Sequence, residues 1–406
     1  MSELRPRGER RRMTPPIARH GRLRRSNAAA TVARYLAAAL AVALVSAGSV
    51  AGYAVWDIAN SAKPGVPLVG ETLGPPPNIG AIEGGVNFLL AGSDSGGGDA
   101  QYGKRGEHLN DVTILLHISQ DHTNATVVSF PRDLFVHLPN CPREDGKGNY
   151  GSWTTKINES LTYGGLACTV LTVSELTGLD IPFAAKIEFN GVIEMANAIG
   201  GVEVCVASAI HDRQIGFDLP AGQRTLSGWS ALQFLRSRYG VGDGSDLSRI
   251  SNQQVFLSAL VRKVKSSETL TDPLKVYGLA KAAVGNMQLS HSLQNVNTIM
   301  AIALALKDIE PENIQFVQYP AYDGSVGGRS GVLPAQAMAD KLFSAIKADL
   351  PVKVTGKTGR GSQLDPNAPA PTSSAPPLQG TVELPDQISG QSASVTTCSR
   401  GQTAGG

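Results

Sequence analysis

The 406-residue sequence predicts a layered α/β domain preceded by one membrane-spanning helix. Short apolar runs typical of strands alternate with segments whose apolar residues recur at helical spacing, which favours helices packed on a central mixed sheet. A run of 22 uncharged residues near the N-terminus predicts the spanning helix. Because 42% of all residues are apolar, the chain can build a core, and a globally disordered protein is excluded.

The formal net charge of +2 hides a steep partition of charge along the chain. Residues 1–34 hold ten Arg and two Glu, a local charge of +8, whereas the other 372 residues carry 26 bases and 32 acids, or −6. A partition of this kind indicates two different environments for the two parts of the chain.

The uncharged run extends from Tyr35 to Trp56. As an α-helix it would span roughly 33 Å, close to the ~30 Å hydrocarbon core of a bilayer. The arginines on its N-terminal side predict a single-pass membrane protein with a cytosolic N-terminus and everything after Asp57 outside the cytosol. A cleaved signal peptide is the alternative, although such peptides usually have a shorter apolar core of ~7–15 residues.

The predicted organisation has five parts. A cytosolic basic arm (1–34) and the transmembrane helix (35–56) come first, and a Pro/Gly-rich extended linker (57–81) follows. The extracytoplasmic domain is expected over 82–350. Residues 351–406 contain the sequence APAPTSSAPP and few large apolar side chains, so we expect this tail to be largely disordered.

Within the domain, apolar runs predict five strands and helical periodicity predicts six helices. The strands are expected at Val86–Ala91, Val112–Ile118, Ala125–Phe130, Ala185–Phe189 and Ile314–Tyr319. The helices are expected at Leu166–Leu176, Gly191–Ile199, Ala231–Leu235, Asn252–Lys265, Ser292–Leu306 and Ala335–Ile346.

The chain has four cysteines, Cys141, Cys168, Cys205 and Cys398. In an exported domain they are expected to be oxidised, and four cysteines allow three pairings among which the sequence does not choose. A zinc site is a weaker interpretation, because the chain has no CxxC or HxxxH spacing.

Two acids stand at the ends of predicted strands. Asp94 follows the run NFLLAG, and Asp111 immediately precedes the run VTILLHI. Each alone is commonly a turn or cap residue. Two carboxylates near Gly-rich loops can instead hold a hard cation such as Mg²⁺, which takes one or two carboxylates together with phosphate oxygens.

Four arginines stand out in a domain of net negative charge. Arg132 directly follows a strand, Arg236 and Arg238 alternate and would face the same way in an extended segment, and Arg249 lies near a helix start. A base at a helix N-terminus is unfavourable unless an anion is also present. The four guanidinium groups predict a phosphate site. Solvated basic surface is the alternative, and nucleic-acid binding is disfavoured.

Several motifs occur together between residues 85 and 265, in one order. They are GSDS (92–95), the Asp111–Thr113 strand start, SFPRD (129–133), KINES (156–160), AIGGV (198–202), LSGWSALQFLRSR (226–238) and DLSRISNQQ (246–254). With these motifs and the predicted membrane anchor, the chain resembles the LytR-CpsA-Psr family of cell-envelope proteins.

The resemblance implies a phosphotransferase that moves a polyprenyl-pyrophosphate-linked glycopolymer onto a peptidoglycan hydroxyl and forms a phosphodiester. It implies an α-β-α domain with a hydrophobic tunnel for the lipid, whose lining residues the sequence does not name. The Arg-, Ala- and Gly-rich composition favours an actinobacterial wall polymer such as arabinogalactan. A phosphatase and a non-catalytic binder of lipid-linked precursors remain as alternatives.

The resemblance also assigns roles to residues. Asp94 and Asp111 would coordinate Mg²⁺ or Mn²⁺. From the chemistry of the transfer we also expect Asp111 to accept the proton of the attacking hydroxyl, directly or through metal-bound water. Asp133 and Asp246 would orient arginines, and Asp111, Arg132 and Arg238 would be the catalytic residues. The expected pyrophosphate ligands are Arg132, Lys156, Arg236, Arg238, Arg249 and Gln253.

The sequence departs from the family pattern at two places. Leu109 and Asn252 stand where the family usually has arginines. Two lost positive charges would weaken phosphate binding unless Lys104 or Arg105 substitutes for them. Some relatives carry a further C-terminal domain, for which the tail after residue 351 is too short and too biased in composition.

Overall fold

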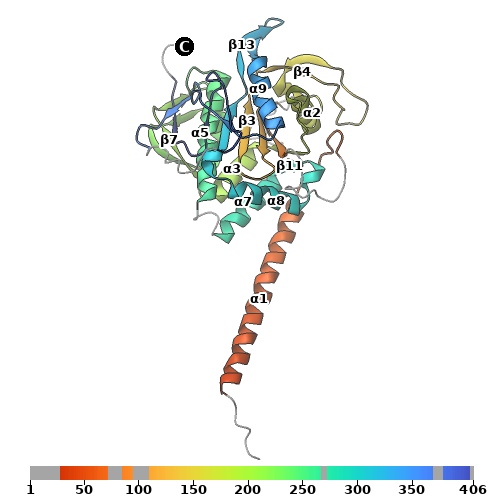
Figure 1. Cartoon of the computed structure of the whole chain (residues 1–406), viewed down its shortest axis with the longest axis vertical. Helices are drawn as coiled ribbons and strands as arrows, with labels where there is room; N and C mark the ends of the chain where they lie inside the picture. Colours follow the sequence, from red (N-terminus) through yellow and green to blue (C-terminus); the bar gives the residue numbers. More distant parts are fainter. Residues whose placement is uncertain (1–27, 72–84, 95–108, 267–271, 369–377, 403–406) are drawn as a thin grey trace, which may run out of the picture. The chain divides into compact units, whose positions relative to one another are not determined.

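The computed structural model describes residues 28–71, 85–94, 109–266, 272–368 and 378–402 (Figure 1). The chain divides into two compact units, residues 1–54 and residues 55–406, each of which is described by itself.

The smaller unit consists, in its described part, of helix α1 (Ala28–Ser61), which continues into the larger unit. None of the side chains of α1 is buried. The helix is long and apolar enough to cross a membrane, a test that a signal sequence also passes. It begins before and ends after the predicted span of 35–56, because the flanking residues are mostly alanine and other residues that tolerate a helix.

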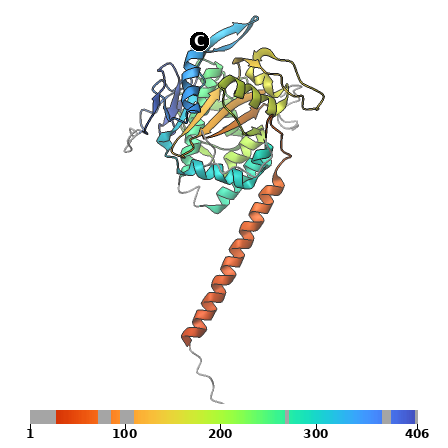
Figure 2. The same cartoon turned by 45° about the vertical axis from the view of Figure 1, so that its right-hand side comes forward.

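A mixed sheet of seven strands forms the centre of the larger unit (Figure 2). The spatial order of its strands is β11 (Met287–Leu289), β6 (Phe183–Ile187), β1 (Val86–Ser93), β2 (Asn110–Ile118), β3 (Ala125–Phe130), β12 (Ile314–Gln318) and β18 (Gly390–Ser392). The β1–β6 and β3–β12 pairs are parallel and the other pairs are antiparallel.

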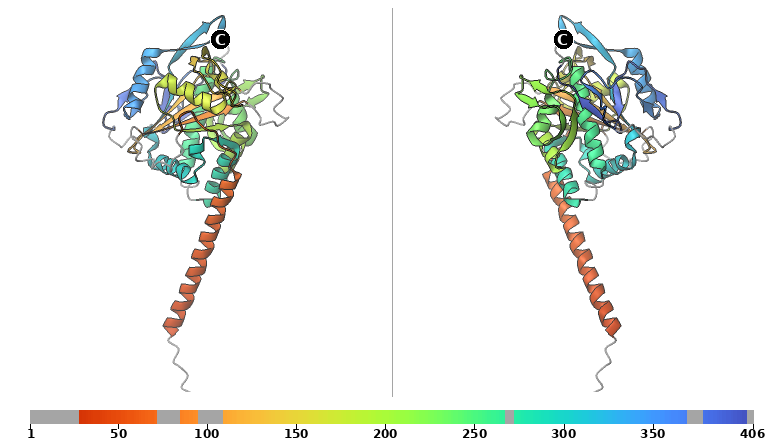
Figure 3. Two further views of the ribbon diagram at one scale, coloured as in Figure 1. Left: turned by 90° about the vertical axis from the view of Figure 1, so that its right-hand side faces the viewer. Right: turned by 90° about the vertical axis from the view of Figure 1, so that its left-hand side faces the viewer.

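Helices cover both faces of this sheet, as the two side views in Figure 3 show. On one face, α2 (Gly165–Thr177) and α9 (Gln336–Lys347) pack on alternate strand residues such as Leu89, Leu115 and Val128. On the other, α5 (Asp246–Lys265) and α8 (Val296–Asp308) pack on residues such as Ile114 and Val127. Because side chains alternate along a strand, one apolar run supplies both cores. The predicted α-β-α fold class is confirmed.

Three more helices complete this set: α3 (Phe189–Ala198), α4 (Gly228–Arg236) and α7 (Pro273–Asn286). All five predicted strands and all six predicted helices have counterparts, and all of them except β3 have shifted ends. Helix α7 was not predicted. Its sequence, PLKVYGLAKAAVGN, is broken by two glycines, and among its side chains that the structure describes only Val284 is buried.

Short strands form a second sheet and three hairpins that the sequence did not predict. The second sheet has the order β10 (Gly222–Leu226), β7 (Val202–Val206), β19 (Thr397–Ser399) and β16 (Ser362–Leu364). The hairpins are β4 (Phe135–Leu138) with β5 (Trp153–Lys156), β8 (Ile210–Asp212) with β9 (Phe217–Leu219), and β13 (Ala321–Val326) with β14 (Arg329–Pro334).

The prediction of a disordered tail is wrong for the described residues after 351. Strand β18 pairs with β12 at an edge of the central sheet, and β19 pairs with β7 and β16. β15 (Val352–Lys353) pairs with β17 (Val382–Glu383). Scattered apolar residues such as Leu384 and Ile388 are buried in the core. Strand pairing, which needs no periodic apolar stripe, holds this segment. Most of the APAPTSSAPP motif lies outside the described residues.

The predicted linker is also partly packed. The first five residues of the predicted linker, 57–61, belong to helix α1. Further along the linker, Val66 pairs with Ser290 and Leu68 is buried in the core. Residues 72–84 lie outside the described part of the chain.

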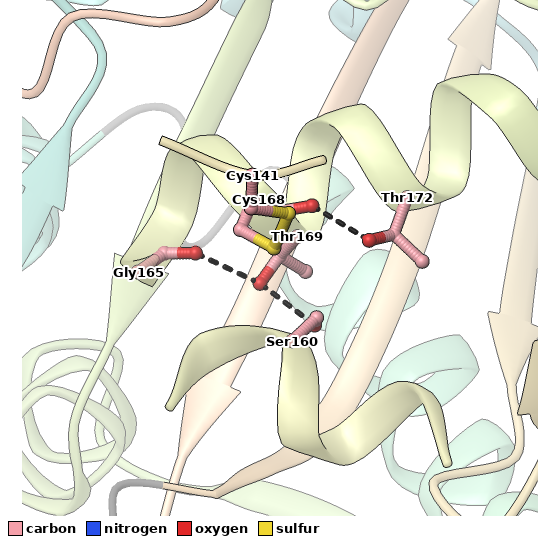
Figure 4. Close-up of a disulfide and its surroundings, with 6 residues drawn as sticks. All are labelled: Cys141, Ser160, Gly165, Cys168, Thr169 and Thr172. Atoms are coloured by element: carbon pink, nitrogen blue, oxygen red, sulfur yellow. Dashed lines mark hydrogen bonds between the residues drawn. A yellow bond between two sulfur atoms is a disulfide. The ribbon is translucent and has the colours of Figure 1, made fainter. Parts of the chain in front are cut away.

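Both disulfides are intramolecular and select one of the three possible pairings: Cys141 with Cys168, and Cys205 with Cys398. The first ties the segment between β4 and β5 to α2 (Figure 4). Around it, Thr169 Oγ1 donates to the Gly165 carbonyl at 3.1 Å and lies 3.0 Å from Ser160 Oγ. The second ties β19 to β7, so it anchors the C-terminal segment to the body of the domain.

Candidate functional site

The site is built on an irregularity where β1 and β2 end. Ser93 lies opposite Asn110 and Gly92 lies opposite Val112, so Asp111 is an extra residue on β2. A bulge of this kind changes the direction in which a side chain points. Gly92 is required here, because a Cβ at this position would lie 2.8 Å from Val112 Cβ.

Two arginines converge on Asp111. Arg132 Nη1 donates to Asp111 Oδ1 at 2.6 Å, and Arg249 Nη1 lies 3.7 Å from the same oxygen. Arg249 Nη2 also donates to the Asp111 backbone carbonyl at 2.9 Å, an oxygen that the bulge displaces from the regular ladder. Burial raises the pKa of the Asp111 carboxyl, but Arg249, Arg132 and Arg236 together hold it below its ordinary value. Asp111 is therefore a carboxylate at neutral pH.

Asp246 connects the end of β3 to the start of α5. Pro131 follows β3, and the Arg132 backbone N–H donates to Asp246 Oδ2 at 2.7 Å. Asp246 Oδ1 lies 2.6 Å from Arg249 Nη2, one helical turn further on. Helix α5 begins at Asp246, before the predicted start, because Ser245 caps it by accepting from the Ser248 N–H. An acid in the first turn offsets the unfavourable position of Arg249.

Asp133 forms ion pairs with a second set of basic side chains. Lys156 Nζ donates to Asp133 Oδ1 at 2.9 Å, and Arg238 Nη1 lies 3.5 Å from Asp133 Oδ2. Burial raises the pKa of Asp133, but the hydrogen bond from Lys156 and the charge of Arg132 lower it overall. The structure thus brings Asp133, Lys156 and Arg238 together from three separate segments of the chain.

Arg236 and Arg238 do not lie on an extended strand, so the condition under which their alternation would make them face the same way is not met. Arg236 is the last residue of α4, because the Ser227 cap starts a helix that runs through it. Its guanidinium carbon lies 4.4 Å from the centre of the Phe189 ring, and Nη1 donates to Gln233 Oε1 at 3.2 Å. Arg238 follows the helix and its Nε donates to the Gly244 carbonyl at 3.2 Å.

Asp212 positions this arginine segment, and the sequence reasoning missed it. The buried Asp212 Oδ2 accepts from Ser237 Oγ at 2.9 Å, from the Arg238 N–H at 2.9 Å and from the Gly240 N–H at 3.2 Å. Asp212 precedes Arg238 by 26 residues and lies on the short strand β8, so no local motif connects the two.

Asp94 and Gln253 make backbone contacts. The Asp94 N–H donates to the Leu109 carbonyl, and Asp94 Oδ1 accepts from the Leu109 N–H, both at 3.0 Å. Gln253 Nε2 donates to the Leu235 carbonyl at 3.0 Å. Their assigned roles as metal and pyrophosphate ligands stay predictions.

Asn252, which replaces an arginine usual in the family, has a structural position. Its side chain is buried, Nδ2 donates to the Phe234 carbonyl at 2.6 Å, and Oδ1 accepts from Ser399 Oγ. It therefore joins α5 to α4 and to β19. Lys104 and Arg105, the suggested substitutes, lie outside the described residues.

An apolar cavity of about 180 Å³ adjoins the charged cluster. Its polar lining consists of Ser93, Asp111, Glu188, Arg236, Arg249 and Gln253. The remaining lining is almost wholly apolar and comes from the sheet, α3, α4, α5 and α7, with Ile114, Val192, Met195, Leu235, Phe256 and Leu279 among its residues.

Asp94 and Asp111 are candidate ligands for a cation that is also bound by phosphate oxygens. Asp94 and Asp111 lie on adjacent strand ends, next to the paired Ser93 and Asn110. Among the described residues, the one group of three potential metal donors is Cys205, Asp365 and Cys398, and its two sulfurs form a disulfide. The described part of the chain therefore has no other cluster of three His, Cys, Asp or Glu donors. Two carboxylates suit Mg²⁺ that keeps phosphate oxygens as further ligands.

Fold and site together define an α/β domain in which a cluster of cations and carboxylates borders an apolar cavity. The model of the LytR_cpsA_psr family matches residues 74–348, and the chain belongs to this family. This confirms the resemblance found in the sequence motifs.

The curated relatives include two proteins of Corynebacterium glutamicum. The chain is 30% identical to the cell wall biosynthesis protein LcpA over 268 residues, which cover 59% of this chain and 51% of LcpA. It is 31% identical to the probable cell wall biosynthesis protein LcpB over 279 residues, 65% of this chain and 61% of LcpB. The chain thus spans only part of the length of both relatives, which are consistent with an actinobacterial origin.

A third relative is the polyisoprenyl-teichoic acid–peptidoglycan teichoic acid transferase TagT of Bacillus subtilis, 27% identical over 306 residues (70% of this chain and 88% of TagT). Two solved structures share the fold. The LytR-Csp2A-Psr enzyme of Actinomyces oris has a TM-score of 0.53 at 20% identity, covering 70% of this chain and 96% of that one. TagV of B. subtilis has a TM-score of 0.52 at 21% identity, covering 65% and 96%.

Proposed function

We propose that this protein transfers a glycopolymer from a polyprenyl-pyrophosphate carrier onto a hydroxyl of peptidoglycan, forming a phosphodiester and leaving polyprenyl phosphate. The observation that carries the proposal is that a charged surface and an apolar surface meet in one cavity. Arg236, Arg249 and the ionised Asp111 line the polar part of the cavity together with Ser93, Glu188 and Gln253, and the rest of its lining is apolar. A lipid diphosphate has the same division into an anionic head and an apolar chain.

The arginines supply what a diphosphate needs. Guanidinium groups bind phosphate oxygens in pairs, and in a buried site this stabilises the charge that develops during phosphoryl transfer. Within the described part of the chain, the buried Nε atoms of Arg132 and Arg249 have no hydrogen-bond acceptor. Arg132 Nε lies 4.0 Å from Asp133 Oδ2 and 3.9 Å from Asp246 Oδ1, so the Arg132 guanidinium is also part of the ion-pair network that surrounds the site.

Asp111 has two candidate roles, as a metal ligand and as the acceptor of the hydroxyl proton. The direction of its pKa shift favours one of them. A carboxylate whose pKa is held low by arginines is a weak proton acceptor but a good ligand for a cation. This favours the metal-ligand role for Asp111. When bound by Asp111 and Asp94, Mg²⁺ or Mn²⁺ would neutralise charge on the phosphate oxygens. Asp133 and Asp246 hold Lys156, Arg238 and Arg249 in place around the same region.

The cavity supports binding of the isoprenoid chain. Residues such as Val192, Phe256 and Leu279 offer apolar surface, which favours a hydrocarbon ligand over water. Helix α1 supports a membrane anchor with a cytosolic N-terminus, which would keep the domain beside its carrier lipid and raise the lipid's effective concentration. The two corynebacterial relatives support an actinobacterial wall polymer, such as arabinogalactan, as the transferred glycan.

The test is reconstitution of the full chain in lipid nanodiscs with a polyprenyl-pyrophosphate-linked glycan, Mg²⁺ and peptidoglycan. The proposal predicts glycan covalently linked to peptidoglycan through a phosphodiester. Release of glycan phosphate and polyprenyl phosphate with no linked glycan would show water acting as the acceptor and would assign a phosphatase. Carrier binding without turnover would assign a binder. Either result would overturn the transferase assignment.

A further inference from the structure

Helices α7 and α8 leave large apolar side chains in solvent. Leu274 is 80% exposed and Val276 is 43% exposed at the start of α7, and on α8 Met300 is 52% and Leu304 is 56% exposed. Met300 and Leu304 are four residues apart and share one face of α8. The opposite side of α8 packs on the core through Ile302 and Ala305.

Helix α7 lies against the chain where the predicted membrane span ends. That span ends at Trp56, and Asp57 follows it. Tyr277 OH donates to Asp57 Oδ2, and Lys281 Nζ lies 2.7 Å from the same oxygen. A Cβ on Gly285 would lie 3.7 Å from Ser61 Cβ. Since Tyr277, Lys281 and Gly285 are spaced by four residues, one face of α7 runs along residues 57–61.

The start of α8 is held to the same stretch of chain. The 3₁₀ turn His291–Leu293 lies just before α8. The His291 N–H donates to the Val66 carbonyl at 3.1 Å, and Gln294 Nε2 donates to the Lys63 carbonyl at 3.0 Å. Lys63 is only seven residues beyond Trp56, so an extended chain of that length limits the distance to about 25 Å. Figures 1, 2 and 3 show α7 and α8 at the same end of the larger unit.

We infer that the exposed faces of α7 and α8, called here the docking face and comprising Leu274, Val276, Met300 and Leu304, rest in the interfacial layer of the outer lipid leaflet. The inference rests on the membrane anchor proposed above, because that anchor places residues 57–63 at the bilayer surface. Both helices contact this stretch, and apolar side chains that cost free energy in water are favourable in the interfacial layer.

The docking face bears on access to the cavity. Leu279 of α7 lines the apolar cavity, while Leu274 and Val276 of the same helix are exposed. Helix α7 is therefore a wall between the cavity and the docking face. With α7 at the bilayer, the cavity lies directly behind a helix that contacts the leaflet of the carrier lipid.

The docking face is tested by fluorescence of the full chain in phosphatidylcholine–phosphatidylglycerol nanodiscs that contain brominated acyl chains. Leu274→Trp and Leu304→Trp are made separately in a Trp56→Phe background, which leaves Trp153 and Trp229 as a common baseline. Tyr322→Trp is the matched control, since Tyr322 is 54% exposed on β13, at the opposite end of the larger unit in Figure 1. All three sites are exposed, so the fold is retained.

We expect brominated lipid to reduce the added emission of Leu274→Trp and Leu304→Trp at least twofold, and to leave that of Tyr322→Trp unchanged. The unmodified chain reports the anchor separately, because Trp56 is quenched when the span is in the bilayer. Quenched Trp56 with both α7 and α8 variants unquenched overturns the docking face alone. Unquenched Trp56 overturns the anchor and the docking face with it, while the transferase assignment is judged by the transfer assay. If the emission of the two added tryptophans becomes less quenched as more protein is placed in each nanodisc, the docking face binds a second copy of the chain. That result also overturns the inference.

Discussion

Asp111 and Arg132 face one another because of the register between β2 and β3. Thr113 pairs with Phe130, the last residue of β3, in this antiparallel ladder, and Asp111 on β2 and Arg132 in the turn after β3 each lie two residues beyond that pair. The 2.6 Å contact between Arg132 Nη1 and Asp111 Oδ1 is the result. The central ion pair of the site thus follows from a hairpin of neighbouring strands.

Replacing the Asp111 carboxylate should disable the site while the fold survives. We expect Asp111→Asn to lower the rate of glycopolymer transfer by about 10²–10³-fold, the usual effect of losing one group that stabilises charge at a reaction centre. The exposed Asp218 on β9 offers a matched control, and Asp218→Asn should transfer at the normal rate. Transfer by the Asp111 variant at the normal rate would remove Asp111 from the mechanism.

Arg238 should be needed for catalysis. Its guanidinium is held by Asp133 and by the Gly244 carbonyl. We expect Arg238→Ala to lower turnover about 10²-fold, and Arg238→Lys to recover only part of it because an ammonium lacks the planar fork. Arg143→Ala, which changes an arginine of the exposed loop before β5, is the control for lost positive charge. Equal turnover by the two alanine variants would argue against the assignment.

Asn252 should behave as a structural residue. Its buried amide joins the Phe234 carbonyl to Ser399, so Asn252→Arg would place a charge there without a carboxylate partner. We expect this variant to lose about 3 kcal/mol of unfolding free energy, measured by chemical denaturation. Gln336→Arg, on the exposed side of α9, should be neutral. A stable Asn252→Arg variant with faster transfer would instead show that the arginine usual in the family is simply missing.

Acid stability should depend on Asp243, in the loop between Arg238 and α5. Burial raises the pKa of Asp243, but hydrogen bonds from Ser245 and Ser248 and the charge of Arg360 lower it to about 2. An unfolded Asp titrates near ~3.9, so its stabilising contribution is complete above about pH 4 and is lost as the pH falls toward 2. The effect is modest because the side chain is 39% exposed.

The unfolding free energy of Asp243→Asn should therefore fall less between pH 4.5 and 2.5 than that of the native chain, because Asn does not titrate and the contribution of this residue is removed. Asp218→Asn again serves as the control. Identical pH profiles for the native chain and Asp243→Asn would show that the loop carboxylate does not stabilise the folded state.

The local parts of the fold were predictable from the sequence. Strand β3 has the predicted ends, and the motif SFPRD already placed Arg132 at a strand terminus. The bulge at Asp111 and the end of α4 at Arg236 were not predictable, because both depend on pairing and packing that a linear pattern does not encode.

Long-range contacts account for the rest. Asp212 reaches the Arg238 segment from β8, and Cys398 is joined to Cys205 across 193 residues. The tail is held by strand pairing and by the disulfide, and not by a continuous apolar face. Its sequence therefore needs no periodic apolar pattern. Sequence reasoning finds residues that act near their own motif and misses those that support them from elsewhere.

The most direct measurement is a structure of the full chain with a polyprenyl pyrophosphate bound in the presence of Mg²⁺. The account predicts the diphosphate within hydrogen-bond distance of Arg132, Arg236 and Arg249, and the isoprenoid chain in the cavity against Val192, Phe256 and Leu279. A diphosphate bound away from these arginines, or an isoprenoid chain outside this cavity, would contradict it.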